Sequence, residues 1–238
     1  MSNNNIPLNI FQYWHSEELP EKMKLATEQI KNSNPEFNYF LFNEKSALEF
    51  LQNNFTKEVV YSFKKLKPSA FKSDLFRYCF LFIHGGIYID VKLIPFNNFK
   101  FIELVNSEHY VKDFTACNNN NAGNISQTII VSHKNNSLLL ECIRRIIINV
   151  NSKFYGKSCL LVTGPGLVAK TYRDIGYNTD YIDMFHIGFD FIIKYNNKVI
   201  LHIYPEYRQE QKKYQKEPYY VKLWKDGNVY YSDKEINN

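Results

Sequence analysis

Two short stretches of the chain place acidic and basic side chains at spacings that suit a charged ligand. Asp74 and Arg77 are three residues apart, so on a helix they share one face. Asp90 and Lys92 are two residues apart, so on a strand they share one face, about 7 Å from each other. The dipeptide 85–86 is Gly-Gly, which permits a tight turn between the two stretches. A helix and a strand folded back on each other would bring all four charges to the carboxyl end of one strand.

These residues lie within a regular alternation of expected elements. Helices are expected at residues 20–31, 44–53, 57–66, 69–83 and 137–150, and strands at residues 8–14, 39–42, 87–93, 127–132, 159–162, 189–195 and 198–204. The helix at 69–83 has its apolar residues at helical spacing, with Ser69 as the expected N-cap and Gly85 after its end. Such alternation predicts an α/β domain with a mostly parallel sheet, whose ligands bind at the carboxyl ends of strands.

The charged pairs also have a purely structural interpretation. In that interpretation Asp74 and Arg77 form an ion pair on a helix surface, which contributes less than about 1 kcal/mol to stability. Asp90 and Lys92 then lie at an exposed strand end. Residue types and spacing leave this alternative open.

The composition restricts the classes of function. The chain has 238 residues, 45% of them hydrophobic and 22% charged, which predicts one globular domain spanning residues 1–238. The formal net charge is only +5, and Lys greatly outnumbers Arg, which argues against nucleic acid as the main partner. Dinucleotide-binding and P-loop glycine patterns are both missing. The four cysteines are far apart and are expected to be reduced and buried.

The sequence also carries expectations about location. Residues 1–5 lack the basic start and apolar core of a signal peptide, and no apolar run approaches the ~18–20 residues that span a bilayer. We therefore expect no transmembrane segment and a cytoplasmic protein. The abundance of Asn, Ile, Lys, Phe and Tyr suggests AT-rich coding, and if that reflects a large DNA virus the place of action is the host cytoplasm or the virion. The oligomeric state is left open.

The charged stretches resemble a known signature. Ser73–Arg77 followed by Gly85–Lys92 resembles S-D-x-x-R and G-G-I-Y-x-D-x, the core of the DXD-containing glycosyltransferases of family 32, which the large glucosylating toxins share. Residues 6–14 resemble the opening strand of that family, and residues 125–132 and 163–165 resemble its middle motifs. The resemblance is clear over residues 6–95 and thinner beyond them.

The resemblance implies a GT-A glycosyltransferase fold, in which a Rossmann-like nucleotide-binding half joins an acceptor-binding half. It implies retaining transfer of a hexose from a UDP- or GDP-sugar to a glycan or protein acceptor. Trp14 then stacks on the base, Asp74 and Arg77 contact the donor sugar, and Asp90 is a catalytic residue and metal ligand. The other expected substrate-binding residues are Gly86, Tyr88, Arg208 and Trp224. The alternative is a catalytically inactive module that binds a nucleotide sugar or a glycan.

The chain departs from the family at the second DXD carboxylate, because the motif here contains Asp90 and then Lys92. A protonated lysine cannot ligate Mn²⁺ or Mg²⁺. Three hypotheses follow, and all remain open. Lys92 itself supplies the positive charge that a departing nucleoside diphosphate needs and is a catalytic residue; or Asp90 holds a metal with help from one of His202, Glu206 and Asp183; or the chain binds without turnover.

Overall fold

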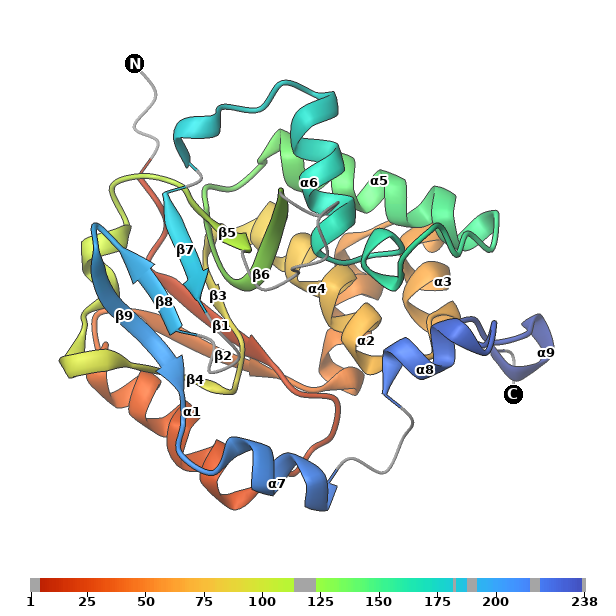
Figure 1. The fold of residues 1–238 in the computed structure, drawn as a ribbon. Helices are drawn as coiled ribbons and strands as arrows, with labels where there is room; N and C mark the ends of the chain where they lie inside the picture. The colour runs from red at the N-terminus through yellow and green to blue at the C-terminus, as the bar shows by residue number, and fades with distance from the viewer. Residues whose placement is uncertain (1–4, 114–122, 182, 188–191, 215–218, 237–238) are drawn as a thin grey trace.

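The computed structural model describes residues 5–113, 123–181, 183–187, 192–214 and 219–236 (Figure 1). Within these ranges, nine strands form one sheet in the order β2-β1-β3-β6-β5-β7-β8-β9-β4. The strands are β1 (Asn9–Tyr13), β2 (Asn38–Phe42), β3 (Gly86–Ile89), β4 (Leu93–Pro95), β5 (His109–Asp113), β6 (Asn124–Ser132), β7 (Met184–Ile187), β8 (Ile192–Tyr195) and β9 (Lys198–Ile203).

Helices cover this sheet in two groups. The helices are α1 (Glu21–Ser33), α2 (Glu44–Asn54), α3 (Lys57–Lys65), α4 (Ser69–His84), α5 (Ser137–Asn151), α6 (Pro165–Asp174), α7 (Tyr207–Tyr214), α8 (Tyr220–Lys225) and α9 (Asp233–Ile236). Figure 1 shows α2 to α6 gathered on one side of the sheet, with α1 and α7 side by side away from them. Both faces of the central strands are therefore buried: Tyr88 of β3 belongs to the apolar cluster under α2 to α6, and Ile87 and Ile89 belong to the cluster on the other face.

The observed sheet is mixed, so the expectation of a mostly parallel sheet was wrong. Strand β1 pairs in parallel with β2 and β3, and β5 pairs in parallel with β7, whereas the other pairs are antiparallel. Among the described strands, two of the five antiparallel pairs involve β5 or β7, short strands that the sequence pattern did not predict. The expected strand at residues 159–162 is also wrong, because residues Cys159–Leu161 form a 3₁₀ turn, η3.

The expected helices at residues 20–31, 44–53, 57–66, 69–83 and 137–150 are confirmed with shifts of at most two residues at either end. The expected strand at 87–93 is instead two strands, β3 and β4, separated by a turn. Residues 189–191 of the expected strand at 189–195 lie outside the described residues, and the remainder is β8.

Helix α4 is the element that buries the charged motif. Its residues are buried without interruption from Phe71 to Leu81, so even its polar face is covered. Its N-cap is Pro68 rather than the expected Ser69, and no side chain caps it. It ends as expected at Gly85, which has φ +63°, a conformation that favours glycine. The chain turns there directly into β3.

Gly86 allows β3 to lie closely against β1. Its φ is +112°, and a Cβ atom at this position would lie only 2.4 Å from the carbonyl oxygen of Asn9. Any other residue would therefore separate the two strands or strain the backbone. The approach places the carboxyl ends of β1 and β3 side by side, which is where the candidate site begins.

The described helices and cysteines bear on two expectations from composition. In the part of the chain that the structure describes, no helix has both the length and the apolar character needed to cross a membrane. The described cysteines, Cys79, Cys142 and Cys159, are free and buried.

Candidate active site

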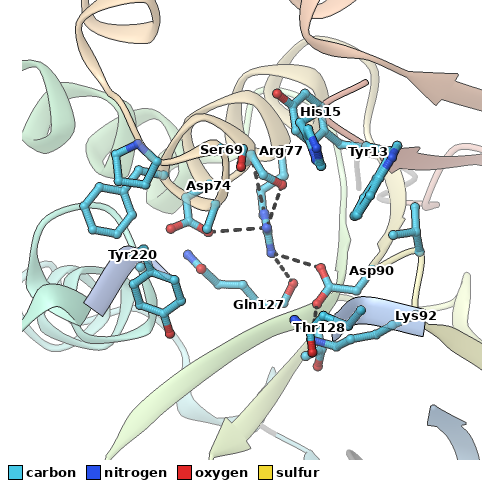
Figure 2. A pocket seen from close by; sticks show the side chains of 18 of the residues that line it. Tyr13, His15, Ser69, Asp74, Arg77, Asp90, Lys92, Gln127, Thr128 and Tyr220 are labelled. Carbon is cyan, nitrogen blue, oxygen red and sulfur yellow. Dashed lines mark hydrogen bonds and ion pairs between the residues drawn. The ribbon is translucent and has the colours of Figure 1, made fainter. Parts of the chain in front are cut away.

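A cavity of about 900 Å³ opens where β1 and β3 end. Its lining comes from segments far apart in the sequence: residues 13–15 at the end of β1, the first turns of α4, Tyr88 and residues 90–92 at the end of β3, residues 126–128 of β6, the turn around 159–165, helix α7 and residues 219–220. The two charged stretches of the sequence thus meet in one concave site. Figure 2 shows their side chains directed into it.

Arg77 is the centre of the site and is held from several sides. Its Nη1 donates a hydrogen bond to the carbonyl oxygen of Gln127 at 2.6 Å, and its Nη2 donates one to Ser73 Oγ at 2.8 Å. Its guanidinium also lies over the ring of Tyr88, 4.2 Å from the ring centroid. Because each contact fixes the planar guanidinium differently, Arg77 has one orientation before any ligand binds.

Arg77 also joins the two carboxylates of the motif. Its Nη2 lies 3.3 Å from Asp74 Oδ1, and its Nη1 lies 3.5 Å from Asp90 Oδ1. Asp74 and Arg77 are only 7% and 6% exposed. The alternative of an ion pair on a helix surface is therefore wrong, because Asp74 and Arg77 form a buried pair that also contacts the partly buried Asp90.

The pKa values of the two carboxylates shift in opposite directions. Burial raises the pKa of Asp74 to about 6, because the loss of water outweighs the attraction of Arg77 and the hydrogen bond from Thr163 Oγ1 at 2.8 Å. Burial acts in the same direction on Asp90, but the positive charges of Lys92 and Arg77 outweigh it and lower the pKa of Asp90 below its ordinary value. Asp90 is thus ionised at neutral pH, whereas Asp74 takes up a proton as the pH falls through its pKa of about 6.

Asp90 and Lys92 are closer than strand geometry predicts. Strand β3 ends at Ile89, and the N–H of Leu93 donates to the carbonyl oxygen of Asp90 at 3.0 Å, which closes a turn. In this turn Lys92 Nζ lies 2.9 Å from Asp90 Oδ2, so the two charged groups form a direct ion pair. The expected ~7 Å is the spacing of the two backbone positions along a strand. The other oxygen of Asp90 accepts a hydrogen bond from the hydroxyl of Tyr88 at 2.6 Å.

Of the remaining expected substrate-binding residues, three line the cavity and two do not. Trp14, Tyr88 and Arg208 are part of its lining. Trp14 is partly buried, its Nε1 donates to the carbonyl oxygen of Glu18 at 3.2 Å, and its ring packs against that of His15, with 4.3 Å between the ring centroids. Within the described chain, the lining includes neither Gly86 nor Trp224.

The positions of Gly86 and Trp224 have physical reasons. Gly86 is buried against β1 and has no side chain to offer a ligand, so its contribution is the strand contact described above. Trp224, on α8, donates from Nε1 to the carbonyl oxygen of Tyr155 at 2.7 Å and packs against the core. Both residues support the walls of the site from outside the cavity.

A divalent metal, which the DXD resemblance implies, fits these residues poorly. Among the described residues, no group of three or more His, Cys, Asp and Glu side chains could hold a metal ion. The three proposed helpers, His202, Glu206 and Asp183, are not part of the described lining that contains Asp90. The ammonium of Lys92 itself lies on the carboxylate that would bind the ion. The site carries a fixed cation where the motif of the family has a second acid.

Glu210 is a residue of the cavity wall for which the sequence predicts no role. It is 8% exposed, and its carboxylate accepts hydrogen bonds from the backbone N–H groups of Lys22 and Met23, at 2.9 and 3.1 Å, and from the hydroxyl of Tyr204 at 2.6 Å. Helix α1 begins after Pro20, which has no side-chain acceptor, and Glu210 supplies one from α7. A partner so distant along the chain leaves no signal in local sequence.

Comparisons with known proteins agree with this geometry. Residues 20–112 match the family model described as glycosyltransferase sugar-binding region containing DXD motif. The chain is 34% identical over 91 residues to the uncharacterized glycosyltransferase L373 of Acanthamoeba polyphaga mimivirus. This match covers 37% of this chain and 36% of that protein. It is 29% identical over 93 residues to the initiation-specific alpha-1,6-mannosyltransferase of Saccharomyces cerevisiae, and this match covers 36% of this chain and 19% of that protein. The matches thus span about a third or less of these relatives.

The fold has its own counterpart among solved structures. The PaToxG glycosyltransferase superposes with a TM-score of 0.53 at 20% identity, covering 75% of this chain and 73% of that one. The fold is therefore of the GT-A glycosyltransferase type, as the resemblance implied. Residues 20–112 match the model of this sugar-binding region, so the resemblance seen in the sequence is confirmed.

Proposed function

We propose that this protein is a retaining glycosyltransferase that moves a hexose from a UDP- or GDP-sugar to a glycan or protein acceptor, with the whole site in one domain spanning residues 1–238. The main support is the network in the cavity that joins the buried Asp74 and Arg77 to the partly buried Asp90, on a fold of the glycosyltransferase type. These residues stand at the positions of the S-D-x-x-R and DXD motifs.

The donor lies along the cavity in this proposal. The base stacks on Trp14, which follows β1, and the sugar lies against Asp74 and Arg77. The ionised carboxylate of Asp90 accepts hydrogen bonds from donor hydroxyl groups. Because Arg77 is already oriented by Ser73 and Gln127, the protein does not have to order it when the donor binds.

Lys92 provides the charge for the leaving group. During transfer the bond between the anomeric carbon and the β-phosphate oxygen breaks, and the acceptor oxygen bonds to the same carbon from the same face. The acceptor proton passes to the departing phosphate oxygen, so no enzymic nucleophile is required. The ammonium of Lys92 stabilises the negative charge that develops on the diphosphate. Arg208, which also lines the cavity, is the second phosphate contact.

The experiment is a donor-hydrolysis screen with the purified protein. UDP- and GDP-sugars are tested one by one, each with Mn²⁺ and with a chelator, and release of the nucleoside diphosphate is measured. We expect release from donors of one nucleotide class, and we expect it to persist with the chelator. The variant Asp90→Ala should remain folded and lose about 100-fold or more of the activity. Wild-type rates in that variant would remove the proposal.

Two other outcomes distinguish the alternatives. Release that requires Mn²⁺ would show that Asp90 recruits a metal partner. No release with any donor, together with a rise in melting temperature for one nucleotide, would identify an inactive binder. Such a rise is easy to see, since a ligand at 100 times its Kd stabilises the folded state by about 2.7 kcal/mol.

A further inference from the structure

Gln127 places a buried hydrogen-bond donor at the cavity. Its side chain is 4% exposed and belongs to the lining of the cavity. Among the described residues, its Nε2 atom has no hydrogen-bond partner. Figure 2 shows the side chain extending from β6 into the space beside Asp74 and Tyr220. A buried amide donor without a partner is unfavourable, so its persistence calls for a ligand that pairs with it.

The backbone of Gln127 is held beside the central network. Strand β6 is buried at every position, and the carbonyl oxygen of Gln127 accepts the 2.6 Å hydrogen bond from Arg77. The residue is thus attached to the same arginine that joins Asp74 and Asp90. The strand and this hydrogen bond fix the position of the backbone from which the amide extends.

The groups around Gln127 indicate the ligand. Asp74 offers carboxylate oxygens that accept hydrogen bonds, and the amide nitrogen of Gln127 only donates. An acceptor beside a donor is complementary to two adjacent hydroxyl groups, one donating to the carboxylate and the next accepting from the amide. The ring of Tyr220 adds an apolar wall on that side. Gly164 leaves room there, since a Cβ atom at its position would lie 3.4 Å from Asp74 Oδ2.

We propose that Gln127 determines which hexose the protein transfers, by donating a hydrogen bond to the ring hydroxyl next to the one bound by Asp74. This inference rests on the proposed function, because it assigns a sugar to the same cavity. A hexose with the opposite configuration at that hydroxyl, or lacking it, leaves the amide unpaired. The site then discriminates strongly, as sites with buried polar groups do.

The test is a cycle of enzyme variants and donor analogues. The preferred nucleotide sugar and its monodeoxy analogues are compared by kcat/KM in the wild type and in Gln127→Leu, which has similar volume and no donor. In the wild type, we expect kcat/KM for one analogue to be at least about 10-fold lower than for the parent sugar. In Gln127→Leu, kcat/KM for the parent sugar should fall by a similar factor relative to the wild type. The same analogue should show no further decrease in this variant, which defines direct coupling between Gln127 and the missing hydroxyl group. Gln127→Met gives the same comparison should the leucine variant not fold.

Gln12→Leu is the matched control. Gln12 is also a buried glutamine whose Nε2 is without a partner among the described residues, but it lies on β1 outside the described lining and accepts from Tyr39 at 2.6 Å. It should keep the analogue pattern of the wild type. If Gln127→Leu also keeps that pattern while turning over the parent sugar, Gln127 does not determine which sugar is used. The role of Gln127 is then refuted, and the proposed function is unaffected.

Binding separates this failure from failure of the proposed function. If the wild type releases no nucleotide, the same cycle is measured as Kd by calorimetry with the same parent and deoxy sugars. Loss of the analogue effect in Gln127→Leu then supports the inference for an inactive binder. Absence of any nucleotide-sugar binding overturns both the proposed function and the role of Gln127.

Discussion

The carboxylate of Glu210 accepts a hydrogen bond from the backbone N–H of Met23, 187 residues earlier in the chain. This contact fastens α7 to the first turn of α1, where the helix dipole favours a negative charge. Because α7 carries Tyr207 and Arg208 into the cavity, Glu210 positions one wall of the site without belonging to the motif.

Replacing Glu210 should loosen that wall. Glu210→Ala leaves Tyr204 and the start of α1 without an acceptor, so we expect the free energy of unfolding to fall by about 1–3 kcal/mol and KM for the donor to rise. Urea denaturation and donor kinetics measure the two effects. Lys213→Ala, an exposed position on the same helix, should change neither. Equal behaviour of the two variants would show that the contact does not hold α7.

Gly86 should be intolerant of any side chain. A methyl group there meets the backbone of β1 at 2.4 Å, at φ +112°, so Gly86→Ala should lower the free energy of unfolding by about 3 kcal/mol or more. Gly176 is the control, because it also has positive φ, +61°, but a Cβ atom at its position would have nothing within 4 Å. Gly176→Ala should cost only about 1 kcal/mol in the same urea denaturation experiment. Similar losses in both would contradict the close strand contact.

Asp74 should make stability depend on pH between about 4 and 6. Its pKa is about 6 in the folded protein and near 3.8 when unfolded, so in this interval the folded state holds the extra proton. The free energy of unfolding is therefore highest, as far as Asp74 is concerned, below pH 4. It falls by roughly 2–3 kcal/mol as the pH rises from 4 to 6. Urea denaturation at pH 4, 5, 6 and 7 measures this.

Asp74→Asn isolates that contribution, since asparagine does not titrate. The difference in unfolding free energy between variant and wild type should shift in favour of the variant from pH 4 to pH 6. A difference that is constant with pH would mean that Asp74 does not carry a raised pKa. Because protonation removes the negative charge of Asp74 and turns one of its oxygens into a hydrogen-bond donor, wild-type kcat/KM should also fall below about pH 6.

Restoring the second acid should create metal dependence. Lys92→Asp removes the ammonium and places a second carboxylate near Asp90, so turnover in a chelator should fall by about 100-fold and Mn²⁺ should restore part of it. Lys92→Met is the control, because it removes the charge without adding a ligand and should not respond to Mn²⁺. An identical metal response in both variants would count against Lys92 as the substitute for a cation.

Trp14 should report nucleotide binding. The chain has two tryptophans, and only Trp14 lines the described cavity. In Trp224→Phe, the remaining fluorescence comes from Trp14 and should be quenched by the nucleotide whose base stacks on it. In Trp14→Phe, the signal of Trp224 should stay constant as the same nucleotide is added. Quenching confined to Trp224 would place the base elsewhere.

The motif and its helix could be predicted from sequence because both depend on neighbours in the chain. The 3.6-residue pattern of 69–83 and the Gly-Gly turn define α4 and β3 locally, and Asp74, Arg77 and Asp90 follow from that geometry. The short distance between Asp90 and Lys92 could not be predicted, because the turn that ends β3 depends on β4 pairing with the distant β9.

The rest of the site depends on contacts between distant segments. Gln127 reaches the cavity because β6 pairs antiparallel with β3, which no pattern around residue 127 indicates. Glu210 stands in a charged stretch that is typical of a solvated helix, yet it is buried by α1. Trp224 is of a residue type that often binds ligands, and only the three-dimensional structure shows that its Nε1 donates instead to the carbonyl oxygen of Tyr155.

The 2.9 Å contact between Lys92 and Asp90 has a consequence for the end of the catalytic cycle. A metal ion can leave the protein together with the nucleoside diphosphate, but a lysine cannot. In the proposed reaction, the carboxylate of Asp90 would compete with the diphosphate for the same ammonium after transfer, and we expect its return to Lys92 to displace the product. Product release should therefore accelerate with ionic strength and should slow markedly when Asp90 is replaced.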